Sequence, residues 1–363
     1  MYMVVILHIL GNGGVLCNLE VLSISYKLAW LLEISCYCAV NCYALITGYV
    51  MVDSKFSYKK IFYLWVDVLF WRLFFTILLN YIYPDLVGKR DLLKSILNIT
   101  YNSYWYFTAY FALFFFIPYI NKLINVLDKK LFKRLVITMI CLFSIINLVF
   151  GTFALSGGYC FTWLIILYFI GAYIKRYNVS KKVNKLYIVI GILFSILITF
   201  VSKMFFIKFP SFTFELFGDG VLVNYTSITI LFVAIGLVLL FSGFNIKNKY
   251  FRRFIKRVAP ATFGVYIIHE HSIVKKIFMT NKFSFIAFND WYLVSLLVLG
   301  IAVIIFMICV YMEMFRKYLF KKLKFYYIGD FLYVIVKKFI NKLESFDKEV
   351  INDEDISYIG NSR

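Results

Sequence analysis

Charged residues are scarce in this chain, and their scarcity is the first constraint on its fold. Of 363 residues, 63% are hydrophobic and only 16% are charged, whereas about a quarter of the residues in a soluble domain are charged. A set of soluble domains is therefore excluded. Only four prolines occur, and no Ser/Gly-rich linker separates modules. These features predict an all-α, polytopic membrane protein folded as a helical bundle.

Histidine and closely spaced cysteine pairs are also rare. The chain has three histidines and seven cysteines. None of the cysteines forms a CxxC motif, and most lie inside apolar runs, where cysteine behaves as a small hydrophobic residue. Zinc sites need several such ligands at short spacing. We therefore expect no metal site.

Acidic residues are half as frequent as basic ones, which leaves a net charge of +20. Such an excess raises the possibility of a nucleic-acid partner. The basic residues, however, occur in clusters between apolar runs, a pattern typical of cytoplasmic loops in membrane proteins. We therefore expect membrane lipids as partners and no nucleic acid. The main clusters lie in 129–134, 175–185 and 252–257.

Ten apolar runs are candidates to cross the bilayer. They cover 1–13, 29–51, 61–83, 103–120, 132–153, 161–174, 186–206, 221–244, 258–274 and 291–313. Under this topology nineteen Lys and Arg lie in inner loops and nine in outer loops, which predicts that both ends are cytoplasmic. The first run is too short, because a spanning helix needs about 20 residues. We expect that the chain begins inside its first, truncated helix.

Two regions are predicted from this division. Residues 1–313 form the membrane domain, and residues 314–363 form a cytoplasmic tail. The tail mixes aromatic and basic residues before an acidic end. Its first part is predicted to lie on anionic lipid as an amphipathic helix, and its end to be disordered.

Polar side chains inside predicted spans are costly and usually functional. They are His8, Glu33, Asn41, Asp67, Arg72, His269, Glu270 and His271. Asp67 and Arg72 are five residues apart, so they pair poorly with each other. Ion pairs with neighbouring helices and a role in a catalytic site explain these two residues equally well. His269 and His271 face different sides of a helix, and Glu33 is expected near the wet outer surface.

Two functional classes fit these residues. A transporter would use the His, Asp and Glu side chains as a proton relay. A membrane enzyme would use a buried histidine as the general base on a hydroxyl substrate. Transporters often interrupt their spans with Gly and Pro near the midplane. Here the prolines lie at or near the ends of the spans, which mildly favours the enzyme.

Four stretches resemble the membrane acyltransferase 3 family. They are AVNCYALITGYVM (39–51), YWYFTAYFALFFFIPYINKLI (104–124), FTWLIILYFIGAYIKRY (161–177) and TFGVYIIHEHSIV (262–274). The resemblance implies a multi-pass bacterial plasma-membrane enzyme that transfers an acyl group, usually acetyl from acetyl-CoA, to cell-surface polysaccharide or its lipid-linked precursor. Family members carry an Arg, ten residues and then a His on the first span. His8 matches the histidine, and the arginine would fall before Met1.

The resemblance assigns roles to the polar residues. His8 is expected to be the general base. Either Arg72 or the arginine expected before Met1 would stabilise the oxyanion, and Arg72 is the catalytic candidate within this sequence. Asn41, His269 and Glu270 are expected to contact the substrate. The phosphates of coenzyme A require a basic mouth on the cytoplasmic side. Candidates by position are Lys59, Lys60, Arg252, Arg253, Lys256 and Arg257, although their charge serves topology equally well. A polysaccharide or solute transporter remains the alternative.

The charge asymmetry makes the topology testable. We expect the loops at 129–134, 175–185 and 252–257 to be cytoplasmic. Single cysteines placed in these loops, in a background without native cysteine, should react with an impermeant thiol reagent only after the cells are permeabilised. Labelling of any one of them in intact cells would refute the orientation.

Overall fold

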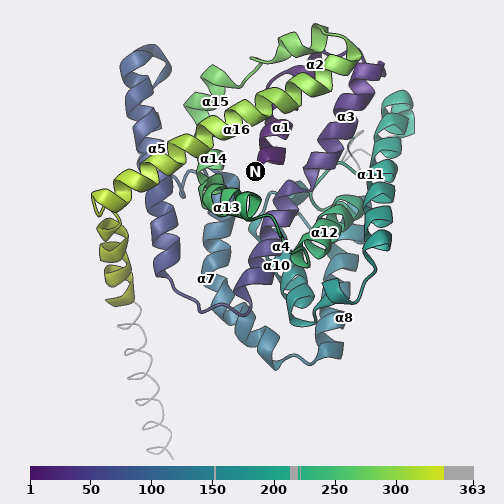
Figure 1. Cartoon of the computed structure of the whole chain (residues 1–363), viewed down its shortest axis with the longest axis horizontal. Coiled ribbons are helices and arrows are strands. Elements are labelled where there is room, and N and C mark those ends of the chain that lie inside the picture. Colours follow the sequence, from purple (N-terminus) through teal and green to yellow (C-terminus); the bar gives the residue numbers. More distant parts are fainter. Residues whose placement is uncertain (151–152, 213–219, 221, 339–363) are drawn as a thin grey trace, which may run out of the picture.

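The computed structural model describes residues 1–150, 153–212, 220 and 222–338, and this part of the chain contains helices and no strand. The long helices form a single bundle around the first one (Figure 1). The helices are α1 (Tyr2–Leu10), α2 (Val15–Asn18), α3 (Ile24–Tyr37), α4 (Ala39–Met51), α5 (Lys59–Ile82), α6 (Lys89–Ile96), α7 (Trp105–Val126), α8 (Lys129–Ile140), α9 (Asn147–Phe150), α10 (Phe161–Arg176), α11 (Lys185–Lys208), α12 (Ile228–Ser242), α13 (Lys249–Val258), α14 (Thr262–His269), α15 (Ser272–Phe278) and α16 (Trp291–Lys322). A π-helical segment, Cys141–Ile146, joins α8 to α9.

Five helical segments in the described part are long and apolar enough to cross a membrane. They are Ile24–Met51, Lys59–Ile82, Trp105–Val126, Lys185–Lys208 and Trp291–Lys322. They confirm the prediction of an all-α, multi-pass membrane protein. The predicted number of ten spans and the location of both ends remain predictions. The expected run 1–13 contains only the short helix α1, and the expected run 258–274 is divided into α14 and α15.

Helices α4 and α10 pack backbone against backbone because a glycine lies on each side of their contact. A Cβ atom at Gly48 would overlap the carbonyl oxygen of Tyr168. One at Gly171 would overlap the carbonyl oxygen of Leu45. Small residues at such crossings let transmembrane helices approach closely and gain van der Waals contact. This pair forms the centre of the larger of the two hydrophobic cores.

A buried group of charges joins α5 to α16. Arg316 Nη1 donates to Asp67 Oδ1 at 2.6 Å, and its Nε and Nη2 donate to both oxygens of Glu313 at 2.9 and 2.6 Å. Trp71 Nε1 also donates to Glu313 at 2.7 Å. Asp67 thus pairs with a neighbouring helix and not with Arg72. Helix α16 continues from Trp291 to Lys322, so the boundary predicted after residue 313 falls inside a continuous helix.

The two ends of the bundle differ in chemistry. At one end, Arg176 donates to Asn125 at 2.7 Å and the Lys129 ammonium lies 5.9 Å from the Tyr177 ring, so two of the basic clusters share this end. The helices α7 and α10 begin at the other end, where the Trp105 and Tyr159 rings are 4.6 Å apart. One end is therefore basic and the other is aromatic.

The α4–α10 contact predicts a sharp effect of side-chain size. Gly171→Leu should destabilise the fold by about 1–3 kcal/mol or more, because the new side chain meets backbone that cannot move aside. Gly191→Leu on α11 is the matched control, since nothing lies within 4 Å of its Cβ position. The measurement is the unfolding midpoint of the detergent-solubilised protein. Equal midpoints for the two variants would contradict the packing.

Candidate functional site

An internal cavity of about 600 Å³ lies between α1, α3, α4, α7 and α14. This volume is in the range of small-molecule sites, about 300–1,000 Å³. Most of its lining is apolar or aromatic. The ionisable side chains in its wall are His8, Glu33, Glu270 and Lys275, together with several tyrosines.

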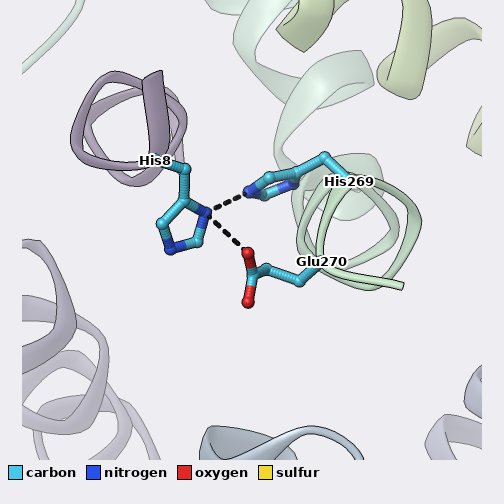
Figure 2. A group of neighbouring side chains, drawn as sticks. All are labelled: His8, His269 and Glu270. Atoms are coloured by element: carbon cyan, nitrogen blue, oxygen red, sulfur yellow. Dashed lines mark hydrogen bonds and ion pairs between the residues drawn. The ribbon is translucent and has the colours of Figure 1, made fainter. Parts of the chain in front are cut away.

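Three ionisable side chains meet at one side of this cavity. His8 Nδ1 lies 2.9 Å from His269 Nε2 and 3.2 Å from Glu270 Oε1. Lys275 Nζ is 2.9 Å from Glu270 Oε1 and donates to Oε2 at 3.1 Å. Figure 2 shows that both partners approach the same nitrogen of His8, while the other ring nitrogen points away from them. Residues 261 positions apart thus form one cluster.

The cluster depends on a break between α14 and α15. Helix α14 ends at His269, and His271 begins α15 by accepting the Val274 N–H on its Nδ1 at 3.5 Å. Since the chain turns here, the neighbouring residues His269 and Glu270 both reach His8. His271 instead lies 3.4 Å from Thr76 Oγ1. The prediction that the two histidines face different sides is therefore correct, although the predicted continuous helix is not.

Hydrogen bonding determines where the protons are. His269 Nδ1 lies 2.5 Å from the carbonyl oxygen of Val265, which can only accept, so this nitrogen carries the hydrogen. The Nε2 of His269 then holds a lone pair and accepts the hydrogen of His8 Nδ1. His8 Nε2 is left unprotonated. A neutral histidine oriented in this way is a general base.

Three of the residues predicted to be catalytic or to contact the substrate lie outside the wall of this cavity, and one of them, His269, is connected to it through His8. Asn41 is fully buried, and its amide donates to the Tyr225 carbonyl at 2.8 Å and accepts from Trp163 Nε1 at 2.9 Å. Arg72 is 1% exposed, and it donates to Ser272 Oγ at 3.1 Å. Asn41 therefore joins helices and Arg72 supports the α14–α15 turn, so neither is placed to touch a substrate in this cavity.

The predicted coenzyme A residues are dispersed. Lys60 lines a second cavity of about 240 Å³, which shares Leu64 and Tyr110 with the first. Lys59 forms an ion pair with Asp330 at 2.6 Å, and hydrogen bonds from Lys59 and Tyr63 lower the pKa of Asp330. The remaining four, Arg252, Arg253, Lys256 and Arg257, are exposed on α13 and line neither cavity.

The His8 cluster also has the composition of a metal site, which the sequence did not predict. Donor atoms of His8, His269 and Glu270 all lie within 4.8 Å of one another. Two observations favour a proton-transfer role. His8 Nδ1 and His269 Nε2, which would both have to face a metal ion, are hydrogen-bonded to each other. The Glu270 carboxylate, which would also bind the ion, is already paired with the Lys275 ammonium. The expectation of no metal remains a prediction.

Two cavity residues were missed by sequence reasoning. Glu33 was expected near the wet outer surface, but it is 8% exposed and lines the cavity. Lys275 was counted only as a charge of an outer loop. Lys275 follows Glu270 by five residues, a spacing that does not bring two side chains together on a continuous helix. Their contact depends on the break between α14 and α15, which the sequence did not predict.

The fold and this cluster define a multi-pass helical membrane protein with a histidine in the wall of a cavity. A family model described as an acyltransferase domain, that of the acyltransferase 3 family, matches residues 1–334, and the chain belongs to this family. The protein is therefore an acyltransferase. The match extends through α16 and past residue 313. No curated protein and no solved structure matches the chain.

Proposed function

We propose that the protein transfers an acetyl group from acetyl-CoA to a hydroxyl of a bacterial cell-surface polysaccharide, or of its lipid-linked precursor, at the plasma membrane. The observation that carries the proposal is the unprotonated Nε2 of His8 in the wall of the cavity. Acyl transfer to a hydroxyl needs a base at the attacking oxygen. Membership of the acyltransferase family favours this reaction over the transporter alternative.

The reaction follows from the direction of the hydrogen bonds. The acceptor oxygen attacks the thioester carbonyl, a C–O bond forms, and the hydroxyl proton moves to His8 Nε2. Collapse of the tetrahedral intermediate breaks the C–S bond. The leaving thiolate then takes the proton from His8, so that the base is regenerated and the products are an ester and free coenzyme A. His269 keeps the ring of His8 in the productive tautomer throughout.

Charges near His8 balance the two states of the base. When His8 is protonated, Glu270 at 3.2 Å stabilises the imidazolium. When His8 is neutral, the Lys275 ammonium balances the Glu270 carboxylate. Lys275 also lines the cavity, and it takes the role of oxyanion stabiliser that the sequence assigned to Arg72.

The two neighbouring cavities offer separate approaches for the two substrates. The smaller one contains Lys60, which follows the basic loop at 55–60. We assign the donor to this side, where an ammonium group favours the phosphates of coenzyme A. The acceptor would then enter the larger cavity from the aromatic end of the bundle.

Removal of the base should abolish transfer but leave the fold intact. His8→Ala should slow acylation by about 10²–10⁴-fold, because it removes the imidazole that His269 orients and with it the proposed base. His271→Ala should have a milder effect. The measurement is the acyl content of purified glycan, by NMR, from a deletion strain complemented with each variant at matched protein level. Near-normal acyl content of glycan from the strain carrying His8→Ala would refute the proposal.

The tautomer argument predicts a graded effect at His269. His269→Phe removes the acceptor for the Nδ1 hydrogen of His8, but Glu270 can replace it at 3.2 Å. Transfer should therefore fall by about 10–100-fold, less than for His8→Ala. His271→Asn is the control, because asparagine is also a good N-cap for α15. A His269→Phe enzyme with wild-type acylation would rule out the role of this hydrogen bond.

A further inference from the structure

Glu33 is a buried carboxyl group, and one of its oxygens has no hydrogen-bond partner among the described residues. It lies in the third turn of α3, is 8% exposed and lines the same cavity as His8. Its Oε2 is buried and makes no hydrogen bond to any residue that the structure describes. No basic side chain of the described part lies within salt-bridge distance of it. The fold gains nothing from this group.

A buried carboxyl oxygen without a hydrogen-bond partner needs a physical explanation. A carboxyl group taken out of water without a hydrogen bond destabilises a protein. Proteins retain unsatisfied polar groups of this kind at sites where a ligand supplies the missing partner. Because the Glu33 side chain lines an open cavity, the partner enters through that cavity. It must carry hydrogen-bond donors.

The wall beside Glu33 is aromatic. Tyr37, at the end of the same helix, has its ring centroid 4.9 Å from that of Tyr225. The Tyr225 ring is 4.9 Å from Tyr159 and 6.0 Å from Trp105, and the last pair is stacked. All four side chains line the cavity. Flat, rigid rings next to a single carboxyl group match a sugar ring, which presents C–H groups on its faces and hydroxyl donors at its edge.

The location of this wall separates it from the donor side. Trp105 begins α7, Tyr159 precedes α10 and Tyr225 precedes α12. These helix starts form the aromatic end of the bundle, away from the basic loops. A ligand entering here approaches His8 from the side opposite to Lys60.

We propose that Glu33, with Trp105, Tyr159 and Tyr225, forms the subsite that binds the acceptor sugar ring. The proposal rests on the acyl-transfer function above and deepens it. Sugar hydroxyls donate to the Glu33 carboxyl group while the ring lies against the aromatic wall. The acceptor is thus held so that a further hydroxyl faces His8 Nε2. Glu33 determines which acceptor is used, and it takes no part in proton transfer.

The test compares Glu33→Leu and Glu33→Gln with Glu20→Gln, an exposed carboxylate that precedes the same helix. Three quantities are measured for the full chain. They are the unfolding midpoint in detergent, the rise of that midpoint on adding acetyl-CoA, and the acyl content of glycan from a complemented deletion strain. Acetyl-CoA binding should raise the midpoint, because ligands stabilise the folded state.

We expect Glu33→Leu to unfold at the same or a higher midpoint, to keep the full acetyl-CoA shift, and to lose at least about tenfold in glycan acylation. Glu33→Gln should be intermediate, since an amide still accepts from a hydroxyl. Glu20→Gln should behave as wild type. If the Glu33→Leu protein does not accumulate, the same three measurements on the isosteric Glu33→Gln protein test the proposal.

Three results would overturn the subsite. Unchanged acylation would show that Glu33 does not bind the acceptor. Loss of the rise in unfolding midpoint on adding acetyl-CoA would show that the Glu33 carboxyl group belongs to the donor site. A lowered midpoint would reveal a structural role. Failure of the proposed function has a different signature: glycan that carries the same acyl content with and without the wild-type protein.

Discussion

A carbonyl oxygen can accept a hydrogen bond and cannot donate one, and the orientation of the whole site depends on this fact. The carbonyl of Val265 fixes the proton on His269 Nδ1, which in turn fixes the proton on His8 Nδ1. Two imidazole rings that could each adopt either tautomer are thereby restricted to one. The tautomer of His8 is thus set by a main-chain group on another helix.

The carbonyl can play this role because α14 stops where it does. A continuous helix would place Glu270 about 100° around the axis from His269, and the two side chains would not reach the same nitrogen. The turn between α14 and α15 removes that restriction. Buried groups hold it in place: Tyr104 donates to the Ile267 carbonyl at 2.8 Å, and Arg72 donates to Ser272. Arg72 therefore supports the shape of the backbone at this turn.

Sequence reasoning predicted the membrane bundle better than it predicted which polar side chains meet inside it. Composition and apolar runs predicted the membrane bundle, and an isolated imidazole in an apolar run identified His8, because both signals are local. Arg72 was expected to be catalytic and Asn41 to contact the substrate because both lie inside predicted spans, and that position does not distinguish a group that joins helices from one that faces a cavity. Lys275 and Glu33 were missed since their placement depends on a helix break and on helix packing, which no short window of sequence contains.

Leu64 and Tyr110 line both cavities, so these two side chains lie where the two spaces adjoin. This has a consequence for the energy supply of the cell. An enzyme that draws substrates from opposite faces of a membrane would discharge the ion gradients if its interior formed a continuous aqueous pore. The side chain of Leu64 and the ring of Tyr110 make this contact mainly apolar, and apolar constrictions exclude hydrated ions. Under the proposed assignment of donor and acceptor to the two cavities, such a contact would keep the membrane potential intact during acyl transfer.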